Sequence, residues 1–290
     1  MTESELVSLW EADKTIYAEW GDCVSHHILG NIDLSLGEEY RQKFLQIVSA
    51  PRLKETSSLV DKAFYRRKNY VNPYLDIKDK VGVRFVVLHT KHLQELNDYI
   101  SKPELWRIQQ DRDYVETRER APEFFGYEAI HYIVEPINDL EWNGTLIPAG
   151  TPCEVQLKTI LQHAYSELAH DTIYKPQTEV TAKAKRYCAK AMALIEATDD
   201  YFLTVIEEIE KAEDAMSSTA KQLGSLYQGL LKLHPEPGRF NEELILAYAD
   251  LLNEDWFKDI SSFYNSRPWL VQQIKTEVPY RHLVRQPAVL

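Results

Sequence analysis

The first fifty residues carry apolar side chains at helical spacing. In residues 4–29, and again in residues 37–50, apolar positions recur three or four residues apart, which predicts two helices. Gly30 and Gly37 lie between them, and glycine disfavours a helix interior, so the first helix is expected to end near residue 29. Residues 1–50 are therefore predicted to form N-terminal helices.

Between residues 51 and 175 apolar and polar residues alternate in short runs, which is the period of half-buried strands. A helix beginning near Thr56 or Ser57, a short helix over residues 92–100 and a hairpin turn at Asn143-Gly144 separate these runs. The charged segment 111–125 has no apolar period and is predicted to be a loop. We expect an α/β core with a mixed sheet of about five strands and helices on both faces. The predicted strands are residues 52–54, 83–87, 105–110, 129–134 and 153–157.

Residues 176–290 are predicted to be a C-terminal helical region. Apolar residues at helical spacing predict one helix over residues 191–212 and a second over residues 223–233, and two more helices follow them. This half offers no pairing of a nucleophile with a base. We therefore interpret it as a scaffold, an oligomer surface or a regulatory segment.

Composition is that of an ordinary globular protein, with 44% hydrophobic and 27% charged residues. No apolar run approaches the ~20 residues of a membrane helix and the N-terminus is acidic, so we expect a cytoplasmic protein without membrane contact. Cys23, Cys153 and Cys188 lie far apart, which predicts neither a disulfide framework nor a zinc site. The net charge of -12 argues against general nucleic-acid coating, because such binding neutralises phosphates.

A local basic segment runs against this acidic balance. Ser58, Lys62 and Arg66 recur every four residues, which places them on one face of the predicted helix. Arg52 and Lys54 precede them. Lysine supplies a point charge and arginine a planar group that can also stack on a base, so the set suits a triphosphate. A solvated basic face is the alternative.

Carboxylates on two predicted strands offer a second kind of chemistry. Glu154 and Gln156 share one strand face, and Asp79 lies in the turn before the strand that carries Gly82 and Arg84. If Glu154 comes to lie beside Asp79, the two carboxylates can share a Mg²⁺ ion, which takes oxygen ligands and stays in contact with phosphates. The alternative is that Glu154 and Gln156 lie on a solvated edge.

The segment after Glu154 contains a histidine stripe. Thr159 is expected to cap a helix on which His163, Glu167 and His170 lie on one face. Such a stripe can ligate a metal, although a dinuclear site would need a second Glu-x-x-His and the sequence has none. Tyr127, at the end of the predicted loop, can stack on a nucleobase or act as an ordinary packing aromatic.

Five short motifs then follow one another along the chain. They are Arg52-x-Lys54-x-x-x-Ser58-Leu-x-x-Lys62, Asp79-x-x-Gly82-x-Arg84, Gly126-Tyr127-x-x-x-His131, Glu154-Val-Gln156-Leu-Lys158-Thr159, and Glu167-x-x-His170-x-x-x-Tyr174-Lys175. In order and spacing they resemble the synthetase domain of the RelA/SpoT family, the enzymes that make the alarmone (p)ppGpp. The motifs span about residues 50–175. Because the flanking segments are short, the chain resembles a small stand-alone synthetase.

The resemblance implies a nucleotidyltransferase-like fold and a pyrophosphokinase reaction. The β,γ-pyrophosphate of ATP would pass to the 3′-hydroxyl of GDP or GTP with Mg²⁺ as cofactor, and AMP would be released. Glu154 would also accept the hydroxyl proton. By position in the motifs, Arg52 and Arg84 would hold the adenine; Lys54, Ser58 and Lys62 the phosphates; Asp79 and Glu154 the Mg²⁺; and Tyr127, His131 and Gln156 the acceptor.

The sequence departs from the family pattern mainly on the acceptor side. Glu128 and Ala129 occupy the middle of the Gly-Tyr motif, where the family commonly has Arg or Gln followed by Ser, and the loop before it is longer. Some toxic small members pyrophosphorylate the 3′-end of tRNA and are neutralised by an antitoxin, which is a second hypothesis here. A non-catalytic nucleotide-sensing module is a third. Small members often form homo-oligomers, and the helix over residues 178–214 is the expected contact surface.

Overall fold

The structure is a computed structural model of the 290-residue chain. It describes residues 1–66, 69–101, 104–112, 125, 129–169, 180–236, 238–253, 255–278, 280 and 285–289. The chain divides into two compact units, Met1–Leu203 and Thr204–Leu290. Among the described residues, no helix combines the length and the apolar character needed to span a membrane.

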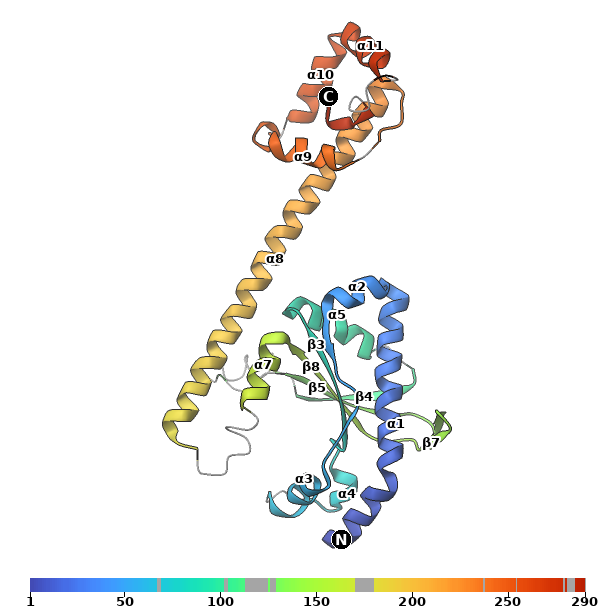
Figure 1. The fold of residues 1–290 in the computed structure, drawn as a ribbon, viewed down its shortest axis with the longest axis vertical. Coiled ribbons are helices and arrows are strands. Elements are labelled where there is room, and N and C mark those ends of the chain that lie inside the picture. The colour runs from blue at the N-terminus through green and yellow to red at the C-terminus, as the bar shows by residue number, and fades with distance from the viewer. Residues whose placement is uncertain are drawn as a thin grey trace. The chain divides into compact units, whose positions relative to one another are not determined.

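The first unit is built on a six-stranded mixed sheet with the order β1-β3-β8-β5-β4 (Figure 1). β3 and β8 are parallel, whereas the other pairs are antiparallel, and β2 pairs with the same edge of β3 as β1. A hairpin of β6 (Leu140–Trp142) and β7 (Thr145–Ile147) turns at Asn143-Gly144, as predicted. The mixed α/β class is confirmed, with six strands in place of about five. The strands of the main sheet are β1 (Leu45–Val48), β2 (Arg52–Leu53), β3 (Val81–Val87), β4 (Trp106–Arg112), β5 (Ile130–Pro136) and β8 (Cys153–Thr159).

Helices cover both faces of this sheet. α1 (Glu3–Leu36) and α5 (Thr90–Ser101) pack on one face, and α7 (Ile160–Ala169) lies on the other (Figure 1). Four shorter elements complete the fold around the sheet: α2 (Glu38–Phe44), α3 (Thr56–Val60), the π-helical turn η1 (Asp61–Tyr65) and α4 (Pro73–Asp76).

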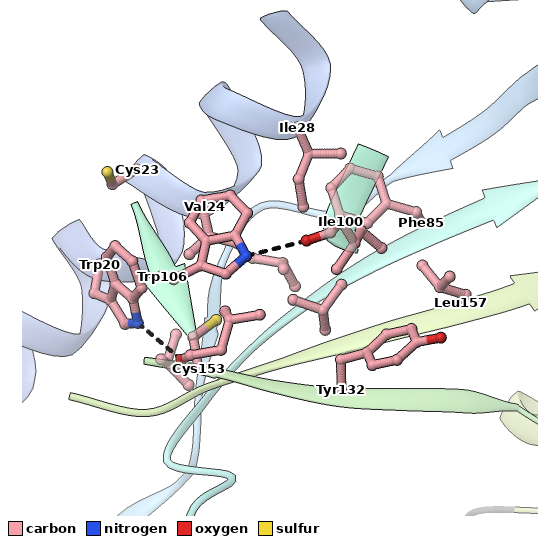
Figure 2. Close-up of a cluster of buried hydrophobic side chains, with 14 of the residues drawn as sticks. Trp20, Cys23, Val24, Ile28, Phe85, Ile100, Trp106, Tyr132, Cys153 and Leu157 are labelled. Carbon is pink, nitrogen blue, oxygen red and sulfur yellow. Dashed lines mark hydrogen bonds between the residues drawn. The ribbon is translucent and has the colours of Figure 1, made fainter. Parts of the chain in front are cut away.

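The hydrophobic core fills the space between the sheet and the helices α1 and α5 (Figure 2). Phe85 of β3 and Leu157 of β8 point into it and are fully buried. The indole N–H groups of two core tryptophans are hydrogen-bonded. Trp20 Nε1 donates to the backbone carbonyl of Val134 at 3.4 Å, and Trp106 Nε1 donates to the backbone carbonyl of Ile100 at 3.1 Å. Because side chains alternate along a strand, the residues between these core positions face the opposite side of the sheet.

Gly21 lets α1 approach the sheet closely. A Cβ atom at this position would lie 2.7 Å from Cβ of Pro51 and 2.9 Å from Cγ2 of Val81, closer than carbon atoms pack. Only glycine therefore fits where α1 crosses the start of β2 and β3. This contact holds the segment that leads into Arg52.

The prediction for residues 1–50 was wrong in two places. α1 runs through Gly30 and ends at Leu36, because buried Ile28 and Ile32 pack on either side of the glycine and outweigh its cost of ~1 kcal/mol. The second segment is helical only to Phe44. Residues Leu45–Val48 instead form β1, since the edge of β3 supplies the backbone hydrogen bonds that a helix would otherwise provide.

Helix α8 (Ala182–Leu231) begins in the first unit and ends in the second. The two helices predicted over residues 191–233 are thus one helix, because no proline interrupts the segment and a long helix tolerates Gly224 and Gly229. In the second unit, Leu226 and Tyr227 of α8 are buried, as is Ile245. The other elements of this unit are α9 (Arg239–Ala247), η3 (Ala249–Leu251), α10 (Trp256–Asn265), α11 (Pro268–Glu277) and η5 (Pro287–Val289).

Candidate active site

Strand register brings the predicted site residues together on the face opposite the core. Gly82 of β3 lies beside Glu154 of β8, and Arg84 lies beside Gln156. On the other edge of β8, Gln156 pairs with His131 of β5. The predicted orientation of Glu154, Gln156 and Arg84 is therefore confirmed, and all three are placed on one continuous surface.

Two cavities open on this face and meet at Asp79 and Glu154. The first has a volume of about 610 Å³ and the second about 440 Å³. Asp79 and Glu154 line both of them. Arg52, Lys54, Ser58 and Arg84 line the first cavity, Lys62 and His131 line the second, and Arg66 and Gln156 line both.

Asp79 is held by two lysines. Lys54 Nζ and Lys62 Nζ contact the same oxygen, Asp79 Oδ2, at 2.8 and 2.7 Å. Burial raises the pKa of the Asp79 carboxyl, but the two ammonium groups outweigh it, and the pKa is lowered to about 2. The other oxygen, Oδ1, is buried and makes no hydrogen bond within the described part of the chain. Asp79 is therefore a carboxylate at neutral pH with one oxygen available to a ligand.

The lowered pKa predicts a pH-dependent contribution of Asp79 to stability. With a pKa lowered from 3.8 to about 2, the carboxylate contributes about 2 kcal/mol to the free energy of unfolding. This contribution is present above the unfolded pKa and is lost as pH falls through the folded pKa. Urea unfolding should therefore show D79N less stable than wild type at pH 7, with the gap closing between about pH 4 and 2. D214N, which alters an exposed carboxylate on α8, is the control.

Glu154 is oriented by its two neighbours on the sheet. His131 Nδ1 lies 3.1 Å from Oε1, and Gln156 Nε2 donates to Oε2 at 2.6 Å. Burial raises the pKa of Glu154, but contact with His131 and Gln156 outweighs it, and the pKa is lowered overall. Glu154 is therefore an ionised, oriented carboxylate between the two cavities.

Arg84 is positioned by α7. Its Nη1 donates to Glu167 Oε1 at 2.6 Å and lies 3.4 Å from His163 Nδ1. Two members of the predicted histidine stripe thus contact a guanidinium group, while the third, His170, lies outside the described residues. Arg84 Nε is buried without a hydrogen-bond partner among the described residues. The guanidinium plane is thus fixed at the wall of the first cavity.

Loss of the Glu167 carboxylate is expected to loosen Arg84. Because Glu167 is 58% exposed, the pair contributes little to stability. E167Q should instead raise the KM for a substrate held in the first cavity about fivefold with little change in kcat, corresponding to ~1 kcal/mol of lost positioning. Steady-state kinetics would test this, with E141Q on the exposed β6 strand as the matched control. An unchanged KM for that substrate in E167Q would exclude a positioning role for Glu167.

Two features of α7 also shape the site. Thr159 caps the helix as predicted: its hydroxyl accepts from the Gln162 backbone amide at 3.2 Å, and Gln162 Oε1 accepts from the Thr159 amide at 3.0 Å. Lys158, given no role in the sequence analysis, is 2% exposed and donates to Ser166 Oγ at 3.1 Å. Burial, followed by the charge of Arg84, lowers its pKa to about 7. Lys158 lies two residues after Gln156 on the same strand, and this spacing could have predicted that both side chains face the first cavity.

The basic helix differs in detail from its prediction. Neither Thr56 nor Ser57 caps α3: the residue at the cap position is Glu55, without a side-chain bond, and Thr56 Oγ1 donates to Glu11. The helix then widens into the π-helical turn η1 that carries Lys62. Tyr127, predicted to stack on the acceptor base, lies outside the described residues, as does most of the loop 111–125.

Comparison with protein families connects this surface to a known domain. Residues 51–179 match the family described as the region found in RelA / SpoT proteins. Residues 51–179 are thus similar to the RelA/SpoT family. The match covers β2, β3, β5 and β8, the strands that bear the site. Comparison with curated protein sequences finds no match.

Solved structures share the fold of the region that contains this match. Small alarmone synthetase 1 from Bacillus subtilis matches with a TM-score of 0.57 at 17% identity, over 70% of this chain and 99% of that one. Its complex with the product pppGpp matches with a TM-score of 0.57 at 18% identity, again over 70% and 99%. Small alarmone synthetase 2 from the same organism matches with a TM-score of 0.55 at 20% identity, over 69% and 98%. The chain therefore has the fold of the small alarmone synthetases.

Proposed function

We propose that the protein is a pyrophosphokinase that transfers the β,γ-pyrophosphate of ATP to the 3′-hydroxyl of GDP or GTP, forming (p)ppGpp-type alarmones. The observation that supports this most is the pair of cavities that meet at Asp79 and Glu154. A transfer reaction between two nucleotides needs two binding spaces and a shared set of acidic groups at their junction. The RelA/SpoT domain and its fold agree with this chemistry.

The first cavity suits ATP. Arg52 and Arg84 line it and offer planar guanidinium groups for an adenine, while Lys54 and Ser58 supply donors for phosphate oxygens. Lys62 reaches the junction through Asp79 Oδ2 and would add a further positive charge there. Positioning and charge neutralisation account for most of the catalysis in phosphoryl-type transfer.

Asp79 and Glu154 would hold the Mg²⁺ ion that the family implies. The residues present fit such an ion, because Asp79 Oδ1 is a buried carboxylate oxygen without a hydrogen-bond partner in the described structure. Mg²⁺ prefers one or two carboxylates together with substrate phosphates. When bound, it would neutralise charge on the transferring phosphates.

Glu154 would act as the proton acceptor. The acceptor's 3′-hydroxyl oxygen forms a bond to the β-phosphorus of ATP, the bond from that phosphorus to the α-phosphate oxygen breaks, and AMP leaves. The hydroxyl proton passes to Glu154, which is ionised at neutral pH. Lys54, Ser58 and Lys62 hold the pyrophosphate group during the transfer.

The second cavity would hold the acceptor, with His131 and Gln156 in its wall. Tyr127 would stack on the acceptor base by its place in the motif. The relative crystallised with pppGpp supports a guanine nucleotide as the acceptor. Glu128 and Ala129, which depart from the family motif, favour a second candidate acceptor, the 3′-end of tRNA, in a toxin that an antitoxin neutralises.

Label transfer tests the proposal. The protein would be supplied with Mg²⁺ and ATP labelled on its terminal phosphate, and offered GDP, GTP, ATP or tRNA in separate reactions. Label on GDP or GTP would support an alarmone synthetase, whereas label on tRNA alone would support the toxin. If no acceptor gains label while ATP still binds, the protein is better explained as a nucleotide-sensing module than as either enzyme.

Helix α8 would provide the homo-oligomer contact. Tyr187, Leu194 and Tyr201 repeat every seven residues and are 59%, 69% and 72% exposed. A seven-residue apolar repeat is the pattern of a helix that packs on a second helix. Light scattering of wild type and L194E would measure the oligomer, and an unchanged mass would exclude this surface.

A further inference from the structure

Three neighbouring strands bring a mixed group of side chains together at the second cavity. Asp111 of β4, His131 of β5 and Glu154 of β8 each place one ligand atom within 4.8 Å of the other two. His131 is only 6% exposed, whereas Asp111 is exposed at the cavity mouth. All three residues line this cavity.

Strand pairing between β4 and β5 brings Asp111 beside His131, at a break in register. β4 and β5 pair Gln110 with Tyr132 and Arg112 with His131, so Asp111 is an extra residue between two paired ones. Such a bulge turns a side chain away from the direction that regular pleating would give it, and bulges are frequent beside functional sites. A regular strand would have paired Asp111 itself with His131, and the bulge leaves Asp111 beside His131 while it pairs Arg112 with the same residue.

The lysine and arginine side chains that line this cavity pair with carboxylates outside the group. Each positively charged residue that lines the cavity in the described part of the chain already contacts another carboxylate. Lys62 contacts Asp79 at 2.7 Å, Arg66 contacts Asp61 at 2.7 Å and Lys78 contacts Glu135 at 3.1 Å. Asp111 and Glu154 therefore have no lysine or arginine partner among the described residues that line the cavity.

We propose that Asp111, His131 and Glu154 form a binding site for a divalent transition-metal ion. Two carboxylate oxygens and one imidazole nitrogen are ligands that such ions share, and the nitrogen disfavours Mg²⁺, which prefers oxygen. The site shares Glu154 with the proposed Mg²⁺ position, but uses Asp111 and His131 in place of Asp79. It exists whether or not the protein transfers pyrophosphate.

Manganese binding without nucleotide tests the site. Free and bound Mn²⁺ would be separated by electron paramagnetic resonance, and pulsed spectra would report any ¹⁴N nucleus bonded to the metal. Wild type is expected to bind one Mn²⁺ ion with a nitrogen signal. D111N should weaken Mn²⁺ binding about 10- to 100-fold, the range seen even when an outer partner of a metal ligand is lost. H131Q should also remove the nitrogen signal.

Matched variants decide the outcome. H26Q alters an exposed histidine on α1 and should keep both the affinity and the nitrogen signal. Asp111 is exposed, so D111N should fold normally even if H131Q does not. Mn²⁺ bound to wild type without a nitrogen signal would overturn the site. Mn²⁺ binding that is lost in D79N but retained in D111N would also overturn it. Because no nucleotide is present, a failure of pyrophosphate transfer would leave this result unaffected.

Discussion

Replacing Asp79 with asparagine should lower the rate of pyrophosphate transfer about 10³-fold. The substitution keeps the shape of the side chain but removes the charge that Lys54 and Lys62 contact at 2.8 and 2.7 Å. It also replaces Oδ1 or Oδ2 with an amide nitrogen, which does not ligate Mg²⁺. Loss of a single group that stabilises the charge of the transition state typically costs about 10² to 10³ in rate, and a metal ligand is expected to lie at the upper end.

The initial rate of label transfer from ATP would be measured for D79N and for wild type, with the acceptor on which wild type is active. D214N, at an exposed carboxylate on α8, serves as the control and should retain the wild-type rate. Circular dichroism and urea unfolding at pH 7 would separate a chemical effect from the ~2 kcal/mol loss of stability expected for D79N. A D79N rate within a few-fold of wild type would refute the metal assignment of this residue.

Replacing Glu154 with glutamine should also lower kcat about 10³-fold, but for a different reason. Glutamine cannot accept the 3′-hydroxyl proton, and general base catalysis contributes about 10² to 10⁴ in rate. Its amide would also face Gln156 Nε2, which now donates to Oε2 at 2.6 Å. ATP should still bind, because Arg52, Lys54 and Ser58 of the first cavity are unchanged.

Single-turnover kinetics at several pH values would separate the roles of Glu154. In wild type the low pKa of Glu154 predicts a rate that falls only in acid, as the carboxylate takes up a proton. E154Q should lose this acidic limb together with most of the rate. E141Q, at an exposed glutamate of β6, is the control. If E154Q kept both the rate and the acidic limb, another residue would be the base.

Much of the site was predictable because strand geometry is local. Alternation along residues 153–157 placed Glu154 and Gln156 on one face, and the same rule placed Arg84 opposite Phe85. The roles proposed for these residues came from the order of the motifs and not from alternation. Tyr127 stays a prediction, since the structure does not describe it.

Other contacts could not be predicted, since they join residues distant in sequence. The sequence put Lys54 and Lys62 near a phosphate, but not on a single oxygen of Asp79. It placed Glu167 on a histidine stripe, whereas packing of α7 turned it toward Arg84. Spacing within a helix says which residues share a face, and not which partner that face meets.

The sequence by itself determined the α/β class, the strands that carry the site and the face on which Arg84, Glu154 and Gln156 lie, because a period of 2 residues is a property of the local backbone. Tertiary structure alone decided that α1 continues through Gly30, that residues 45–48 join the sheet as β1, and that Asp111 enters the group with His131 and Glu154. Each of these depends on packing or pairing with a distant segment, whose free energy outweighs local preference.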